Sequence, residues 1–107
     1  MSPNKIHILA EVNSLLRTRF SDNLKDVILF GSRLSENFKD ESDYDILVIL
    51  KKKVDWKKER EISDILYDIE LKYNIVTDTH IICEAELETP RGKQPIFLNA
   101  IEKGIHA

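Results

Sequence analysis

Two short apolar runs constrain the fold of this chain more than any other feature of its sequence. Residues 27–30 (VILF) and residues 45–50 (DILVIL) are almost purely apolar, the second with an aspartate at its start. Runs of this length, bounded by glycine or charged residues, are typical of strands buried on both faces of a sheet. The 14 residues between the runs fit either a parallel crossover or an antiparallel return, so the pattern leaves the strand direction open.

The rest of the chain is predicted to form helices and a third strand. Residues 75–83 (IVTDTHIIC) are rich in β-branched residues, which predicts another strand. The predicted helices are residues 4–20, one or two turns within residues 32–42, residues 51–73 with Trp56 on the apolar stripe, and residues 95–103 with Gly104 as the stop. Helices that alternate with strands in this order predict an α/β fold, a small mixed β-sheet with packed helices.

Length, composition and charge narrow the class of protein. A chain of 107 residues, 42% hydrophobic and 33% charged, is expected to form one domain over residues 1–107. The net charge of −3 argues against nucleic acid as the main partner, because backbone binding usually requires a basic excess. Cys83 is the single cysteine, so no internal disulfide forms, and no apolar run has the length of a signal peptide or a membrane span. We expect a cytoplasmic protein without a membrane anchor.

The segment between the apolar runs carries residue types that bind phosphate and metal. Asp43 and Asp45 are two positions apart, so in a strand both carboxylates point to the same side. Two carboxylates that close repel each other unless a cation lies between them, and oxygen ligands suit Mg²⁺ or Mn²⁺. Gly31 allows a phosphate to approach the backbone, Ser32 can donate a hydrogen bond to it, and Arg33 can add a positive charge.

The order of these features resembles the signature of the DNA polymerase beta nucleotidyltransferase superfamily. That signature is Gly-Ser, ten residues, Asp-x-Asp and an apolar run, present here as Gly31-Ser32, residues 33–42, Asp43-Tyr44-Asp45 and residues 46–49. The chain is most similar to the minimal nucleotidyltransferases, over most of its length. Many members continue with an Arg-Ala-Arg-Gly-like run, of which this chain keeps only Arg33, a difference that bears on nucleotide preference.

The resemblance implies a polymerase beta-like fold, a site and an activity. Gly31, Ser32 and Arg33 would hold a nucleoside triphosphate, expected to be ATP. Asp43, Asp45 and a third acidic residue on the next strand, Asp78, would bind two Mg²⁺ ions, with Asp78 also activating the attacking hydroxyl as a base or as a metal ligand.

Known members of the family include antitoxins that transfer AMP from ATP to a tyrosine of a HEPN-type ribonuclease toxin. We therefore expect an antitoxin whose acceptor is a tyrosine of such a partner, with self-association as the other source of acceptor-binding surface. One alternative is a small-molecule, aminoglycoside-type nucleotidyltransferase, although such enzymes generally carry a further helical domain. The other is a non-enzymatic module that neutralises a partner by contact.

Several further residues have both a functional and a structural interpretation. His80 shares a face with Asp78 by strand alternation and could line the pocket, although a lone histidine is more often structural. The lysines of residues 51–58 could attract nucleotide or an acidic partner, or simply start a solvated helix. The basic stretch at residues 89–97 could reach phosphates or be a surface loop. Cys83 is predicted to be a core residue.

Overall fold

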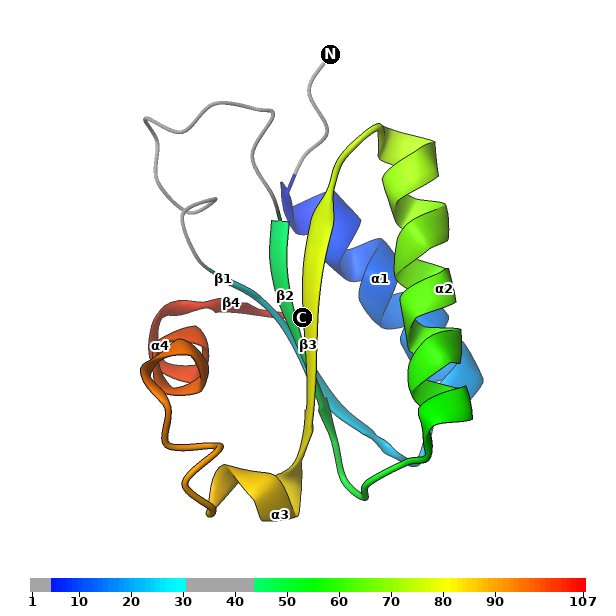
Figure 1. The fold of residues 1–107 in the computed structure, drawn as a ribbon. Coiled ribbons are helices and arrows are strands. Elements are labelled where there is room, and N and C mark those ends of the chain that lie inside the picture. Colours follow the sequence, from blue (N-terminus) through cyan, green and yellow to red (C-terminus); the bar gives the residue numbers. More distant parts are fainter. Residues whose placement is uncertain (1–4, 31–43) are drawn as a thin grey trace.

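The computed structural model describes residues 5–30 and 44–107. The elements are α1 (Lys5–Phe20), β1 (Leu24–Phe30), β2 (Tyr44–Leu50), α2 (Trp56–Tyr73), β3 (Thr77–Cys83), α3 (Glu84–Leu87), α4 (Pro95–Lys103) and β4 (Ile105–His106). The four strands in these residues form one sheet in the order β3-β2-β1-β4 (Figure 1). None of the described helices combines the length and apolar character needed to cross a bilayer.

The sheet is mixed, and its directions answer the question that the sequence left open. β1 pairs with β2 antiparallel, so the chain returns alongside itself between these two strands. β2 and β3 run parallel, joined by the crossover helix α2. β4 adds a short antiparallel pairing on the other side of β1.

Helices cover both faces of the sheet, which explains why β1 and β2 read as almost continuous apolar runs. α1 and α2 lie on one face and α4 on the other (Figure 1). Within β2, Ile46 and Val48 pack in the cluster beneath α1 and α2, whereas Leu47 and Ile49 pack in the cluster beneath α4. A strand buried on both sides needs apolar residues at every position rather than at alternate ones.

Helix α2 starts later than the predicted helix 51–73. The side chain of Asp55 accepts a hydrogen bond from the amide of Lys58 at 3.0 Å, and this N-cap fixes the first turn at Trp56. Trp56 is 65% exposed, so its predicted place on the apolar stripe is wrong. The helix ends at Asn74, whose φ of 55° and ψ of 51° give the left-handed C-cap conformation.

Other boundaries differ by a few residues from those the sequence predicts. β1 begins at Leu24, earlier than residue 27, because Leu24 is buried and pairs with Leu50 across an irregular register step. β3 begins at Thr77 rather than residue 75. The short elements α3 and β4 were not predicted, and the helical turns expected within residues 32–42 lie outside the described residues.

Candidate active site

Asp45 and Asp78 are neighbours across the two parallel strands at the centre of the candidate site. They are register partners, and each is the second residue of its strand. β2 and β3 begin at the same end of the sheet (Figure 1), so both aspartates lie at that end. Adjacent strands are about 4.8 Å apart, which brings the two carboxylates within reach of one cation. Strand alternation places both residues on the α4 face, together with Leu47 and Ile82.

The two carboxylates lie beside a buried aromatic residue on one side and are exposed to solvent on the other. Phe30 pairs with Asp45 across the antiparallel strand and is 7% exposed. Asp45 is partly buried, whereas the Asp78 side chain is 56% exposed and accessible to a ligand. The pair thus joins a partly buried carboxylate to an accessible one.

His80 lies beside Asp78 on the same face, as strand alternation predicts. Its Nε2 atom is 3.6 Å from Asp78 Oδ2 and, among the described residues, is buried without a hydrogen-bond partner. The imidazole ring packs near Phe30, at 6.0 Å between ring centroids, and edge-on to Phe97 at 6.3 Å. His80 therefore connects the carboxylate pair to the apolar packing under α4.

The remaining predicted site residues are Gly31, Ser32, Arg33 and Asp43, and they lie outside the described residues. The residues on either side of that segment are described: Phe30 ends β1 and Tyr44 begins β2. Because Phe30 is the register partner of Asp45, the last residue of β1 and the first residue of β2 lie at the same end of the sheet as Asp45 and Asp78.

Comparison of the sequence with known protein families gives a match over most of the chain. The family model described as "Polymerase beta, Nucleotidyltransferase" matches residues 11–89. The chain belongs to this nucleotidyltransferase family. The match confirms the resemblance drawn from the Gly-Ser and Asp-x-Asp signature, and with it the predicted enzyme class.

Two proteins of Methanocaldococcus jannaschii are similar in sequence to this member of the family. The first, "Putative protein adenylyltransferase MJ0141", is 35% identical over 71 residues, which cover 66% of this chain and 72% of that protein. The second, "Putative protein adenylyltransferase MJ0604", is 27% identical over 101 residues, 94% of this chain and 95% of the other.

A solved nucleotidyltransferase shares the fold. The crystal structure of spectinomycin adenyltransferase AAD(9) from Enterococcus faecialis, with ATP and spectinomycin, has a TM-score of 0.63 and 25% identity to this chain. The match covers 80% of this chain but only 37% of that enzyme's length. It confirms the predicted polymerase beta-like fold.

The donor set of this nucleotidyltransferase site fits the metal that the resemblance implies. Asp45 and Asp78 offer only carboxylate oxygens, which hard cations such as Mg²⁺ prefer. Within residues 5–30 and 44–107, no three metal-binding side chains come together, so the described part of the site supplies two of the three predicted carboxylates.

The lysine cluster lies away from the nucleotidyltransferase site. Lys51, Lys52 and Lys53 are exposed and follow the last residue of β2, whereas Asp45 lies at the start of that strand. Lys51 is six positions after Asp45 along extended chain, a distance of about 20 Å. These three lysines lie in the exposed connection that precedes α2, and only Lys57 and Lys58 belong to the solvated first turn of the helix.

Arg91, in the basic stretch at residues 89–97, is engaged in structural contacts. Its guanidinium donates to the carbonyl of Ile81 at 3.1 Å, lies over the ring of Phe97 at 5.5 Å, and has an ion pair with Glu86 at 3.7 Å. Ile81 is three residues beyond Asp78, so Arg91 covers the free edge of β3 rather than the carboxylate pair. Side chains that bind edge backbone groups protect a strand from pairing with other chains.

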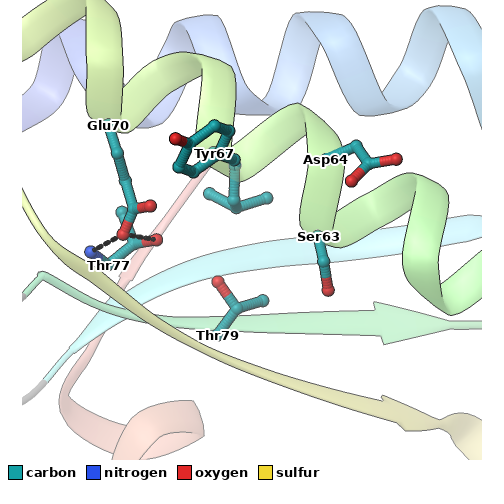
Figure 2. A pocket seen from close by; sticks show the side chains of 7 residues that line it. Ser63, Asp64, Tyr67, Glu70, Thr77 and Thr79 are labelled. Carbon is teal, nitrogen blue, oxygen red and sulfur yellow. Dashed lines mark hydrogen bonds between the residues drawn. The ribbon is translucent and has the colours of Figure 1, made fainter.

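A groove lies on the other side of β3, between this strand and α2 (Figure 2). It has a volume of about 410 Å³ and is lined by polar side chains that include Asp64, Tyr67, Glu70, Thr77 and Thr79. Thr77 and Thr79 alternate with Asp78, so the groove and the carboxylate pair occupy opposite faces of the strand. Glu70 was missed by the sequence analysis, because a helical glutamate gives no signal of a contact with a later strand.

Proposed function

We propose that this protein transfers AMP from ATP to a hydroxyl group of another protein, with Mg²⁺ as the metal. The observation that carries the proposal is the pairing of Asp45 with Asp78 on one face of a polymerase beta-like sheet. The names of the two archaeal relatives, both protein adenylyltransferases, support adenylyl transfer to a protein. The longer of the two matches spans nearly the whole of both chains, which supports a shared activity.

The chemistry is an in-line displacement at the α-phosphorus of ATP. The acceptor oxygen forms a bond to this phosphorus, and the bond from the phosphorus to the oxygen that bridges to the β-phosphate breaks. AMP is then joined to the acceptor, pyrophosphate leaves, and the hydroxyl proton passes to a base. We assign the activation of the hydroxyl to Asp78, as base or as metal ligand, because its carboxylate is the more accessible of the pair.

The remaining roles follow the family signature. Asp43, Asp45 and Asp78 would hold two Mg²⁺ ions, and Gly31, Ser32 and Arg33 would hold the triphosphate. Bound Mg²⁺ would supply charge neutralisation at the α-phosphate of the transferred AMP and on the leaving pyrophosphate. We further infer that residues 1–107 act as one nucleotidyltransferase domain, because a single sheet carries both apolar clusters.

The acceptor we propose is a tyrosine of a partner HEPN-type toxin, which makes this protein the antitoxin of a pair. The support is the similarity to minimal nucleotidyltransferases together with the protein-modifying names of the relatives. A cytoplasmic location follows from this role. Self-association, with one copy presenting surface to another, is the other arrangement that could build an acceptor site.

A small-molecule acceptor is the second candidate, favoured by the structural similarity to the spectinomycin enzyme. The match covers only 37% of that enzyme, whereas the match to the second archaeal protein covers 95% of that relative, whose name gives a protein acceptor. We therefore rank the protein acceptor first.

The test is a labelling experiment with ATP radiolabelled at the α-phosphate, Mg²⁺ and the protein encoded beside this gene. Label should appear on a tyrosine of that protein with the wild type and be lost with Asp45→Asn and Asp78→Asn. Asp64→Asn, an exposed change on the far side of β3, should label as the wild type does. Label on an aminocyclitol or aminoglycoside instead would select the second candidate. Partner inhibition that persists without label in both aspartate variants would show a contact-only module.

A further inference from the structure

The side chain of Glu70 contacts the residue with which β3 begins, just after the connection from α2. Glu70 Oε2 accepts hydrogen bonds from the amide of Thr77 at 2.6 Å and from the Thr77 hydroxyl at 3.0 Å (Figure 2). Thr77 is the first residue of β3 and directly precedes Asp78. Among the described residues Glu70 has no ion pair, so its charge is directed to these two donors, and charge-assisted hydrogen bonds are the stronger ones.

The backbone of Glu70 contacts the other end of the same connection, where α2 stops. The Glu70 carbonyl accepts from the amide of Asn74, the left-handed residue that caps α2, and from the amide of Ile75 at 3.1 Å. The main chain of Glu70 thus fixes where the helix stops, and its side chain fixes where the strand starts. The short connection between the helix and the strand is therefore fixed at both ends, which limits how far β3 can slide along the sheet.

A backbone contact joins this connection to the neighbouring strand. The amide of Tyr44 donates to the carbonyl of Val76 at 2.8 Å, immediately before the paired rows Tyr44 with Thr77 and Asp45 with Asp78. Because side chains alternate along a strand, a shift of one residue in β3 would turn Asp78 to the α2 face and away from Asp45.

We propose that Glu70 is a positioning residue that holds Asp78 in register with Asp45. This inference rests on the proposed function, since it assigns Asp78 to the reacting centre. Glu70 lines the groove on the opposite face of β3 from the carboxylate pair, so it is not placed to bind a metal held by that pair. It acts through Thr77, whose backbone position fixes that of the next residue.

The test compares Glu70→Ala, Glu70→Gln and the control Asp64→Ala, an exposed residue of the same groove. Three readouts are used: exchange of the Thr77 amide by NMR, Mn²⁺ affinity by electron paramagnetic resonance, and the separate values of kcat and KM for ATP. Residues that orient a metal ligand typically change metal affinity or activity about 10- to 100-fold, so Glu70→Ala should weaken Mn²⁺ binding and lower kcat by at least about tenfold. The KM for ATP should change less.

Glu70→Gln keeps an acceptor oxygen without the charge, so it should fall between the wild type and Glu70→Ala. Asp64→Ala should match the wild type in all three readouts. If Glu70→Ala exposes the Thr77 amide and leaves Mn²⁺ affinity and kcat unchanged, the positioning role is wrong. If circular dichroism shows that Glu70→Ala is unfolded, Glu70→Gln decides by the same criteria.

Failure of the proposed function can be told apart from failure of this inference. A wild-type protein that transfers no AMP would contradict the proposed function, while Mn²⁺ affinity and amide exchange would still report on Glu70. If the wild type is active, and Glu70→Ala is equally active and binds Mn²⁺ with the same affinity, only the inference about Glu70 is contradicted.

Discussion

His106 and Asp26 join the last strand of the sheet to its neighbour. His106 Nδ1 lies 2.5 Å from Asp26 Oδ2, and Nε2 lies 2.9 Å from the carbonyl oxygen of Ile101. Both partners are acceptors, so both ring nitrogens donate when the imidazole is protonated. The hydrogen bond with Asp26 is the main cause that raises the pKa of His106 above its ordinary value of 6.5.

This contact predicts a pH dependence of stability. The folded-state pKa is raised, so the contribution of His106 is fully present below about pH 6.5 and is lost as the pH rises through the folded-state pKa. The side chain is 42% exposed, so screening by water limits the effect to under about 1 kcal/mol. Chemical unfolding from about pH 6 to pH 9 should show the wild type losing stability relative to His106→Gln.

Two carboxylates with lowered pKa values do not interfere with that measurement. Hydrogen bonds from Lys72 and from the Cys83 amide lower the pKa values of Glu11 and Glu86, respectively, below their ordinary value of 4.5. Both carboxylates stay ionised throughout the tested range. A constant difference between wild type and His106→Gln across this range would contradict the assignment.

Leu47 tests the packing beneath α4. It is completely buried in β2, and truncation leaves a cavity between the sheet and the helix, so Leu47→Ala should lower the free energy of unfolding by about 2–5 kcal/mol. Leu71, which is 64% exposed on α2, is the matched control, and Leu71→Ala should change stability by less than about 0.5 kcal/mol. Equal effects of the two changes in urea unfolding would be inconsistent with the described core.

Gly104 tests the close approach between α4 and the sheet. Its φ of −76° and ψ of 170° suit any residue, so conformational freedom is not the reason for glycine here. A Cβ atom would lie 2.4 Å from both the Ala100 carbonyl oxygen and Ile28 Cγ2. Gly104→Ala should therefore destabilise the protein by about 1–3 kcal/mol, as overpacked sites do. If Gly104→Ala unfolds at the same temperature as the wild type, α4 and the sheet can move apart without loss of stability, and the prediction is wrong.

Elements with strong local signals could be predicted from the sequence. The apolar runs identified β1 and β2, Pro95 and Gly104 bounded α4, and Cys83 is buried as expected. The late start of α2 was also open to prediction, because Asp55 is a standard capping residue. The lysines before it continue the charged pattern and conceal that boundary.

Relationships through space could not be predicted in the same way. Alternation placed Asp78 and His80 on one face of β3, but it says nothing about which strand lies beside them or in which register. The pairing of Asp45 with Asp78 depends on β2 and β3 being parallel neighbours, and the Glu70–Thr77 contact depends on the turn after α2. The two-residue strand β4 is too short to give a periodic signal.

The central claim is that Asp45 and Asp78 act together in nucleotidyl transfer, and the most direct test is a double-mutant cycle. AMP transfer rates would be measured over a range of Mg²⁺ and Mn²⁺ concentrations for the wild type, Asp45→Asn, Asp78→Asn and the double variant. Each single change should cost about 100-fold or more, and the double variant should be little worse, because residues that act as a unit are not additive. Wild-type rates in Asp78→Asn, or fully additive losses, would contradict the account.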